Sequence, residues 1–241
     1  MNGLGTTSAD WDPSFIDRLA SSNELILLNN RGIGGSTDDG QPFDIAKLAA
    51  DAARVIETLG IERASVMGWS MGGFIAQALA LNYADRVDKL VLLSTDSGGI
   101  EADLASPDVW SGLVDTSGMP NEQARRLLFL LFPTDVAESF YREFGDIVAA
   151  ARAQLSPQLL NRQAAAMDVW HHNGVANQLR EIRVAALSYR NGRHCDSCFK
   201  RAETGERNSW RLACSVPSRR PRVHRAVSTS ARRSNQHFSR G

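Results

Sequence analysis

The chain has 241 residues, of which 43% are hydrophobic, and its 27 basic side chains balance its 27 acidic ones. This length predicts one α/β domain, alone or with an insertion, and the apolar fraction is enough to form a core. No stretch of 18 apolar residues predicts a membrane span and the start has no signal-peptide pattern, so we expect a cytoplasmic protein that does not bind a membrane.

The first predicted elements are a strand, a helix and a second strand. Residues 24–28 form a near-continuous apolar run, which is typical of a buried parallel strand. Asp44 can cap the helix that follows, and Gly60 is its expected stop. The apolar stripe of this helix consists of Ile45, Leu48, Ala52, Val55, Ile56 and Leu59. Residues 64–67 form the next predicted strand.

A G-x-S-x-G motif follows this strand at residues 68–72 and precedes a predicted helix that runs to about Tyr83. A strand–turn–helix around this motif holds its serine on a strained tight turn, with the hydroxyl above the edge of the sheet. The flanking glycines leave the space that the turn needs, because a side chain there would collide with neighbouring backbone. We therefore predict a nucleophile elbow with Ser70 as the catalytic residue.

Another strand is predicted at residues 90–94, and the alternation of strands and helices up to that point predicts a parallel α/β sheet. From residue 100 to about 179 the pattern is helical without strands. Helices are expected at 123–132, 135–152 and 157–170. Such an insertion can cover the elbow as a lid that shapes the pocket and excludes water. The alternative is a satellite bundle without a role in substrate binding. Residues 182–187 then open a further core strand.

Four motifs resemble, in order, segments of the α/β-hydrolase superfamily, in particular its small capped, esterase-like members. They resemble the oxyanion loop, the N-R-G-x-G-x-S turn, the elbow and the sixth strand of that family. In this chain they lie at residues 2–7, 30–36, 68–73 and 91–95. Asn29 departs from the pattern, because the family often has aspartate there. The resemblance implies an α/β-hydrolase-like parallel sheet with a helical lid insertion.

The resemblance also implies how the chain is divided. A partial core, a helical cap, the start of a further core strand and a basic tail are expected at residues 1–98, 99–180, 181–187 and 188–241. The first three strands of the resembled fold would precede residue 1. Because the third of them lies beside the elbow strand in that fold, we expect an incomplete sheet with exposed edges and poor solubility. A start codon that was assigned too late would account for this loss.

The chemistry that the resemblance implies is acyl transfer. Ser70 would attack the carbonyl of a small acyl substrate, and the backbone N–H groups of Met71 and Leu4 would hold the oxyanion. Neither a cofactor nor a metal is expected. Serine rather than aspartate at the elbow argues against the haloalkane dehalogenase and epoxide hydrolase branches. Met71 is also frequent in haloperoxidase-like members, so perhydrolysis stays open as a side activity.

The acid and the base of a triad should follow the elbow in the order Ser, Asp, His, beyond residue 187. That region has no G-x-x-D or G-H pattern, so no catalytic histidine is assigned. His171 and His172 are interpreted as surface or lid residues. The remaining histidines, which lack strand context, are His194, His224 and His237. Asp96 is a candidate displaced acid, because some family members place the acid after the sixth strand, and the alternative is a loop or helix-cap aspartate.

The composition of the chain changes near Leu187. Residues 188–241 carry 13 of the 27 basic side chains, 3 of the 27 acidic ones and all three cysteines. If the gene is read one base later from this point, each new codon takes two bases from the codon of one residue and one base from the next. The codon that overlaps residues 193 and 194 can then encode aspartate, and the codon that overlaps residues 221 and 222, 28 codons later, can encode histidine. We therefore infer a frameshift after Leu187.

Residues 188–241 have three other interpretations besides a frameshifted segment. Its arginines can contact nucleic-acid phosphates, although arginine-rich sequence is also what an out-of-frame GC-rich gene encodes. A zinc site is the second alternative, and its ligands would be Cys195, Cys198, Cys214 and His224. Disorder is the favoured outcome, and we expect no nucleic-acid partner.

The sequence thus supports two hypotheses about function. The first is a serine hydrolase of esterase type, impaired in this chain because its acid and base lie in a different reading frame. The second is a non-catalytic remnant that keeps the elbow as architecture alone. The residues leave the substrate and the oligomeric state open.

Overall fold

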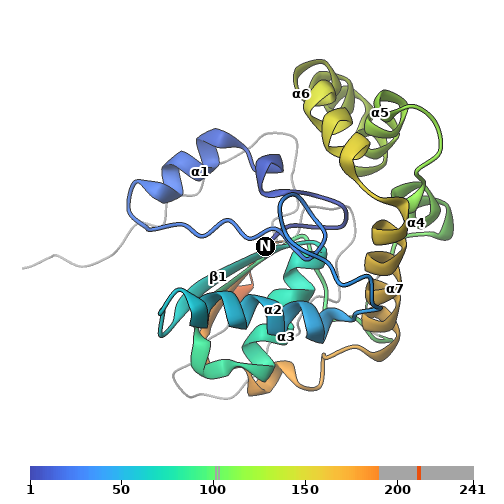
Figure 1. Ribbon diagram of the computed structural model, residues 1–241. Coiled ribbons are helices and arrows are strands. Elements are labelled where there is room, and N and C mark those ends of the chain that lie inside the picture. The colour runs from blue at the N-terminus through green and yellow to red at the C-terminus, as the bar shows by residue number, and fades with distance from the viewer. Residues whose placement is uncertain (101, 103, 190–210, 213–241) are drawn as a thin grey trace, which may run out of the picture.

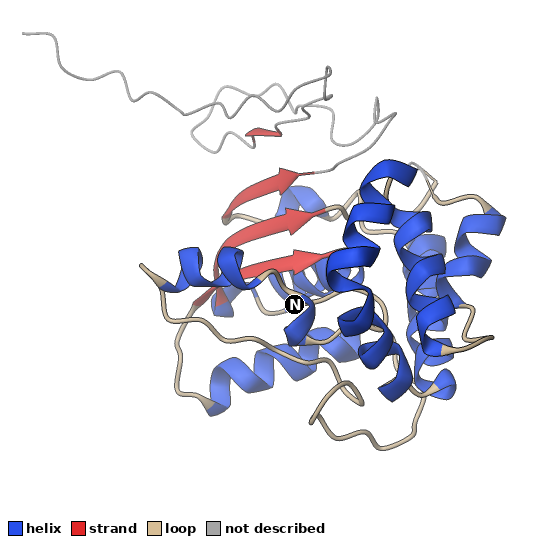
Figure 2. Ribbon diagram, turned by 90° about the horizontal axis from the view of Figure 1, so that it is seen from above, coloured by secondary structure: helices blue, strands red, loops and turns tan. Residues whose placement is uncertain are grey.

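The centre of the protein is a parallel sheet whose strands lie in the order β1-β2-β3-β4 (Figures 1 and 2). In the computed structural model, the described residues are 1–100, 102, 104–189 and 211–212. The strands are β1 (Ala64–Trp69), β2 (Val87–Leu93), β3 (Ala185–Tyr189) and β4 (Arg211–Leu212). The predicted parallel sheet is therefore confirmed.

The register of the sheet brings the carboxyl ends of three strands to one edge. Trp69, the last residue of β1, pairs with Leu93, the last of β2, and Leu93 pairs with Tyr189, the last of β3. Residues that follow β1 and β2 are therefore neighbours in space although they are far apart in sequence. In Figure 2 the strands point toward the side of the molecule where the helices between β2 and β3 are gathered.

Helices α2 (Ile45–Thr58) and α3 (Met71–Asn82) pack against each other, and α3 packs on β1 and β2 (Figure 1). The expected cap of α2 is present, since Asp44 Oδ1 accepts a hydrogen bond of 2.7 Å from the Lys47 N–H. Gly60 follows the helix with φ +69°, a conformation that favours glycine. Leu59 was wrongly included in the buried stripe, because it is 55% exposed at the helix end.

In the described part of the chain, four α-helices lie between β2 and β3, at the right of Figure 1, whereas the sequence predicts three. They are α4 (Pro107–Val114), α5 (Pro120–Leu131), α6 (Thr134–Gln154) and α7 (Pro157–Asn173). Helix α4 is the one that was not anticipated. Helices α5 and α6 pack on each other, whereas α7 contacts α2 and α4. The cap therefore rests on the core through α7.

The remaining helices are short and lie at the surface or in connections. They are η1 (Ser8–Asp10), α1 (Pro13–Ala20), η2 (Ala84–Arg86) and η3 (Leu179–Glu181). Asp12 caps α1 by accepting a hydrogen bond of 2.8 Å from the Phe15 N–H. Neither η1 nor α1 contains a buried residue.

The predicted strand at 24–28 is wrong, because this segment is not assigned as a strand and pairs with no other described residues. Ile26 and Leu27 are 43% and 45% exposed. Among the described strands, β1 lies at the edge of the sheet and pairs only with β2. Its free edge is contacted by Met1, whose carbonyl oxygen accepts a hydrogen bond of 3.1 Å from the Trp69 N–H. A strand needs a neighbour for its backbone groups, and apolar composition alone does not supply one.

The end of the described chain differs slightly from expectation. The strand predicted to open at 182–187 is β3, which continues to Tyr189. The tail was expected to be irregular, yet Arg211 and Leu212 pair with β3 as a short parallel strand. The tail's cysteines and histidines, and with them the zinc alternative, lie outside the described residues. Within the described part, no helix is long and apolar enough to span a membrane.

Candidate active site

Ser70 stands between β1 and α3 in a backbone conformation that side chains rarely adopt. Its φ is 53° and its ψ is −123°, and it occupies the position that precedes the first residue of α3. Such strain persists only where the surroundings impose it. Here the imposing groups are backbone atoms, since a Cβ on Gly68 would lie 2.5 Å from the carbonyl carbon of Gly72. The glycines are therefore required for the turn, as the sequence predicted.

Backbone and side-chain hydrogen bonds attach the turn to the end of β2. The Ser70 N–H donates to the Leu93 carbonyl oxygen at 2.9 Å, and the Gly73 N–H donates to the Ser70 carbonyl oxygen at 2.8 Å. The Thr95 hydroxyl donates a further bond of 2.9 Å to that same oxygen. The Ser70 Oγ itself has no hydrogen-bond partner among the described residues. The main chain of Ser70 is thus fixed while its hydroxyl stays available.

The predicted oxyanion loop lies directly beside Ser70. A Cβ on Gly3 would lie 3.2 Å from the Ser70 Cβ. Two residues on, the Gly5 N–H donates a hydrogen bond of 2.8 Å to Oε1 of Gln163, a fully buried side chain of α7. Leu4 lies between these two anchors. Met71 is the first residue of α3, where backbone N–H groups have no partner within the helix. Both predicted oxyanion donors therefore belong to segments that adjoin the serine.

Two basic groups adjoin this loop, and desolvation lowers the pKa of each. Met1 begins the loop, and desolvation lowers the pKa of its amine to about 6. That amine donates a hydrogen bond of 2.7 Å to the Met67 carbonyl oxygen. Arg152, from the last turn of α6, lies beside Gly5, and desolvation also lowers the pKa of its guanidinium.

Asp96 lies just after β2 and is paired with a histidine from the cap. Its Oδ2 is 3.9 Å from Nε2 of His171, and both side chains are 16% exposed. Its other carboxylate oxygen accepts a hydrogen bond of 2.8 Å from the Gly98 N–H. The His171 ring lies edge-on against Phe74 and Trp110, at centroid distances of 5.3 and 5.9 Å. His171 therefore joins α7 to the core, a contact that the sequence did not reveal.

We expect the replacement of His171 by alanine to lower the free energy of unfolding by about 2 kcal/mol, because it removes two edge-on aromatic contacts. The contact between Asp96 and His171 should contribute less than about 1 kcal/mol to this stability, since the distance of 3.9 Å between their Oδ2 and Nε2 atoms is at the limit for an ion pair. Urea denaturation of His171→Ala, Asp96→Ala and the double variant measures the loss caused by removing the ring and the coupling energy between the two side chains. The matched control is His172→Ala, an exposed neighbour that should change stability by less than about 0.5 kcal/mol. Equal losses for the two histidines would contradict the described packing.

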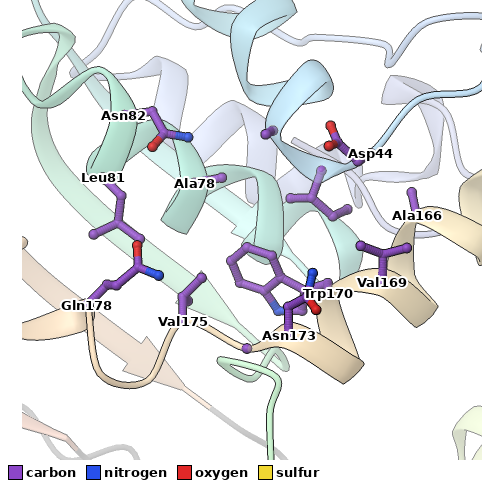
Figure 3. A pocket seen from close by; sticks show the side chains of 13 residues that line it. Asp44, Ala78, Leu81, Asn82, Ala166, Val169, Trp170, Asn173, Val175 and Gln178 are labelled. Carbon is purple, nitrogen blue, oxygen red and sulfur yellow. The ribbon is translucent and has the colours of Figure 1, made fainter.

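A cleft of about 230 Å³ lies between α2, α3 and α7 (Figure 3). Its walls include Ala78 and Leu81 from α3 and Trp170 from α7, with Asp44 at the start of α2. This cleft follows the later turns of α3, whereas Ser70 stands at the beginning of that helix. None of its lining residues belongs to the elbow or to the oxyanion loop. Among the described residues, no group of three or more His, Cys, Asp or Glu side chains could hold a metal ion.

Comparisons with known sequences match most of the chain to one family. Residues 1–190 match the model of the alpha/beta hydrolase fold. A protein of Caulobacter sp. (strain K31), provisionally named as the carbamate hydrolase RutD, is 38% identical over 96 residues, which are 38% of this chain and 34% of that protein. The poly(3-hydroxyalkanoate) depolymerase of Ectopseudomonas oleovorans is 35% identical over 100 residues, 42% of this chain and 35% of the depolymerase. The chain spans about a third of the length of these curated relatives.

Solved structures show the same architecture over a longer stretch. The enol-lactonase of Burkholderia xenovorans LB400 is 26% identical with a TM-score of 0.61, covering 78% of this chain and 69% of the lactonase. A hydrolase of Pseudomonas aeruginosa PA01 is 24% identical with a TM-score of 0.62, covering 79% of this chain and 69% of that hydrolase. At 24% identity, the similarity to the Pseudomonas hydrolase supports a shared fold and nothing further.

Proposed function

The chain belongs to the alpha/beta-hydrolase fold family, and from this membership we propose that it cleaves a carboxylic ester or a related acyl compound with Ser70 as the nucleophile. The observation that carries the proposal is the positive φ of Ser70 at the junction of β1 and α3. A strained turn between a strand and a helix is the arrangement that presents a nucleophilic hydroxyl above the edge of a sheet, and this position distinguishes Ser70 from Ser94. The names of the relatives, which include a carbamate hydrolase, a depolymerase and an enol-lactonase, agree with cleavage at an acyl group.

In the proposed reaction the Ser70 Oγ forms a bond to the carbonyl carbon, its proton passes to a base, and the carbonyl oxygen becomes an oxyanion. The N–H groups of Met71 and Leu4 donate hydrogen bonds to that oxyanion. The bond to the leaving alcohol then breaks, the alcohol takes up the proton, and an acyl-enzyme remains. Water attacks the acyl-enzyme, which releases the acid and restores the serine hydroxyl.

The weak point of this reaction in the described chain is the base. No described side chain accepts the proton of Ser70, because its Oγ has no hydrogen-bond partner. Asp96 stays the proposed displaced acid, and the histidine beside it is His171, which packs on Phe74. Loss of the base from a serine triad lowers turnover by roughly 10⁶-fold, so we propose a slow enzyme. The second candidate function, a non-catalytic family member, rests on the same unpartnered hydroxyl.

A fluorophosphonate probe tests the proposal, because its reaction with a serine is irreversible and slow labelling therefore accumulates with time. We expect the probe to label the wild-type protein slowly at Ser70, and the Ser70→Ala variant to remain unlabelled over the same time. Intact-mass spectrometry measures the modification, and peptide mapping locates it.

Ser94→Ala is the matched control for this experiment. Ser94 directly follows β2 with φ 46° and is the other described residue besides Ser70 that is not glycine and has a positive φ. Its replacement should leave labelling unchanged, because it is not proposed to be a nucleophile. A folded, soluble wild-type protein that resists the probe would favour the non-catalytic alternative.

A further inference from the structure

Arg152 is a buried cation on the inner side of the cap. It is 6% exposed and lies in the last turn of α6. Its Nε donates a hydrogen bond of 3.3 Å to the Gln123 Oε1, and its Nη2 donates one of 3.0 Å to the carbonyl oxygen of Asp115. Its Nη1 has no hydrogen-bond partner among the described residues. The guanidinium is thus held from one side, and its third nitrogen is left over.

The charges around Arg152 do not balance within the described part of the chain. The adjacent carboxylate, that of Asp115, forms its ion pair with Arg126, at 3.2 Å from Nη2 of that residue. No described carboxylate oxygen lies within 4.0 Å of a nitrogen of Arg152. Two guanidinium groups therefore share one carboxylate. An arginine that is buried without a counter-ion is unfavourable, and such groups are normally paired.

The unpartnered nitrogen and the nucleophile lie beside two glycines of the same predicted oxyanion loop. A Cβ on Gly5 would lie 3.6 Å from Nη1 of Arg152, whereas a Cβ on Gly3 would lie 3.2 Å from the Ser70 Cβ. Two residues of extended chain span at most about 7 Å, so the two points of the loop that adjoin the cation and the elbow are no further apart than this. Leu155 and Leu160 lie next to the same point on Gly5 and supply apolar surface beside the guanidinium.

We propose that Arg152 binds a carboxylate on the acyl part of the substrate, so that Ser70 acts on half-esters of short dicarboxylic acids. This inference rests on the function proposed for Ser70. A separation of at most about 7 Å along the loop corresponds to roughly three to five carbon–carbon bonds between the scissile carbonyl and the distant carboxylate. That carboxylate supplies the missing negative charge and accepts the hydrogen bond of Nη1, an arrangement that charge-assisted bonds favour. It is unchanged by the reaction, in which the ester bond alone is exchanged for water.

Binding of the acid product tests this inference independently of catalysis. Glutarate and pentanoate share one carboxylate and the chain length, and they differ in whether the far end is a carboxylate or a methyl group. We expect the wild-type protein to bind glutarate about 10- to 100-fold more tightly, which is the value of a hydrogen bond to a charged group. Isothermal titration calorimetry measures both dissociation constants. This comparison needs no variant, so it does not depend on how a change at Arg152 affects folding.

Variants then test whether Arg152 causes the preference for glutarate over pentanoate. Arg152→Met should bind glutarate and pentanoate equally, and Arg152→Lys should restore part of the preference. Arg126→Met is the control, because that arginine pairs with Asp115 and does not adjoin Gly5. It should keep the full preference for glutarate. Circular dichroism checks that each variant is folded.

The outcomes separate this inference from the one about Ser70. Glutarate preference in a protein that the fluorophosphonate probe does not label supports Arg152 and removes the hydrolase. Labelling of Ser70 without any glutarate preference supports the hydrolase and overturns the role of Arg152. Where Ser70 is active, monophenyl glutarate should be hydrolysed with a kcat/KM about 10-fold or more above that of phenyl pentanoate.

Discussion

Replacing Gly68 with alanine should lower the free energy of unfolding by about 4 kcal/mol or more, enough to unfold a domain of ordinary stability. The new Cβ would overlap the carbonyl oxygen of Gly72 and lie 2.7 Å from the Gly73 Cα. All of these atoms belong to the backbone of the elbow, so no side chain can rotate to make room. The turn would have to open, and Ser70 would lose the hydrogen bond to the end of β2.

Gly35→Ala is the matched control for Gly68→Ala. A Cβ on Gly35 would meet no atom within 4 Å. We expect the free energy of unfolding of Gly35→Ala to stay within about 0.5 kcal/mol of the wild-type value. It can also rise slightly, because alanine lowers the conformational entropy of the unfolded chain. Urea denaturation followed by tryptophan fluorescence measures both variants. The described elbow is wrong if Gly68→Ala unfolds at the same urea concentration as Gly35→Ala.

Truncation of Phe74 to alanine is expected to lower the free energy of unfolding by about 3–5 kcal/mol. The side chain is 2% exposed and stands one turn after the elbow in α3. Its ring stacks on Trp170 of α7 with a centroid distance of 5.4 Å and an interplanar angle of 16°. The change therefore leaves a cavity in the core and removes a contact that holds the cap.

The control for this variant is Phe15→Ala, which also removes a phenylalanine from a stacked pair. Phe15 stacks on Trp11 at 5.8 Å, but it is only partly buried in a helix without buried residues. Its loss should lower stability by about 1 kcal/mol. Thermal unfolding compares the two variants, and near-ultraviolet circular dichroism reports the environment of Trp170. Similar losses at the two positions would mean that α7 is not held to the core as described.

The parts of the fold that the sequence predicts are those whose signals are local. Asp44 and the apolar spacing after it mark α2, because capping and periodicity act within a few residues. The elbow is equally local, since G-x-S-x-G contains both the serine and the glycines that make room for it. The candidate nucleophile and the segments beside it could therefore be located without coordinates.

The parts that the sequence did not predict depend on partners far along the chain. Residues 24–28 have the composition of a strand, but pairing needs a neighbouring strand that no local pattern can supply. His171 and Asp96 are 75 positions apart, and only the fold brings them within 3.9 Å. The unbalanced charge of Arg152 was invisible for the same reason, because its partners Gln123 and Asp115 lie in or before another helix.

The hydrogen bond from Gly5 to Gln163 has a mechanical consequence. It connects the oxyanion loop to α7, and α7 is the helix through which the cap rests on the core. A movement of α7 that admits a substrate must either break this hydrogen bond or pull Gly5 along with the helix. In the second case it would displace the loop beside Ser70. Opening of the cap and displacement of the predicted oxyanion donor, the Leu4 N–H, would then be a single event. The proposed acyl-enzyme would be exposed to bulk water only when this predicted donor is displaced.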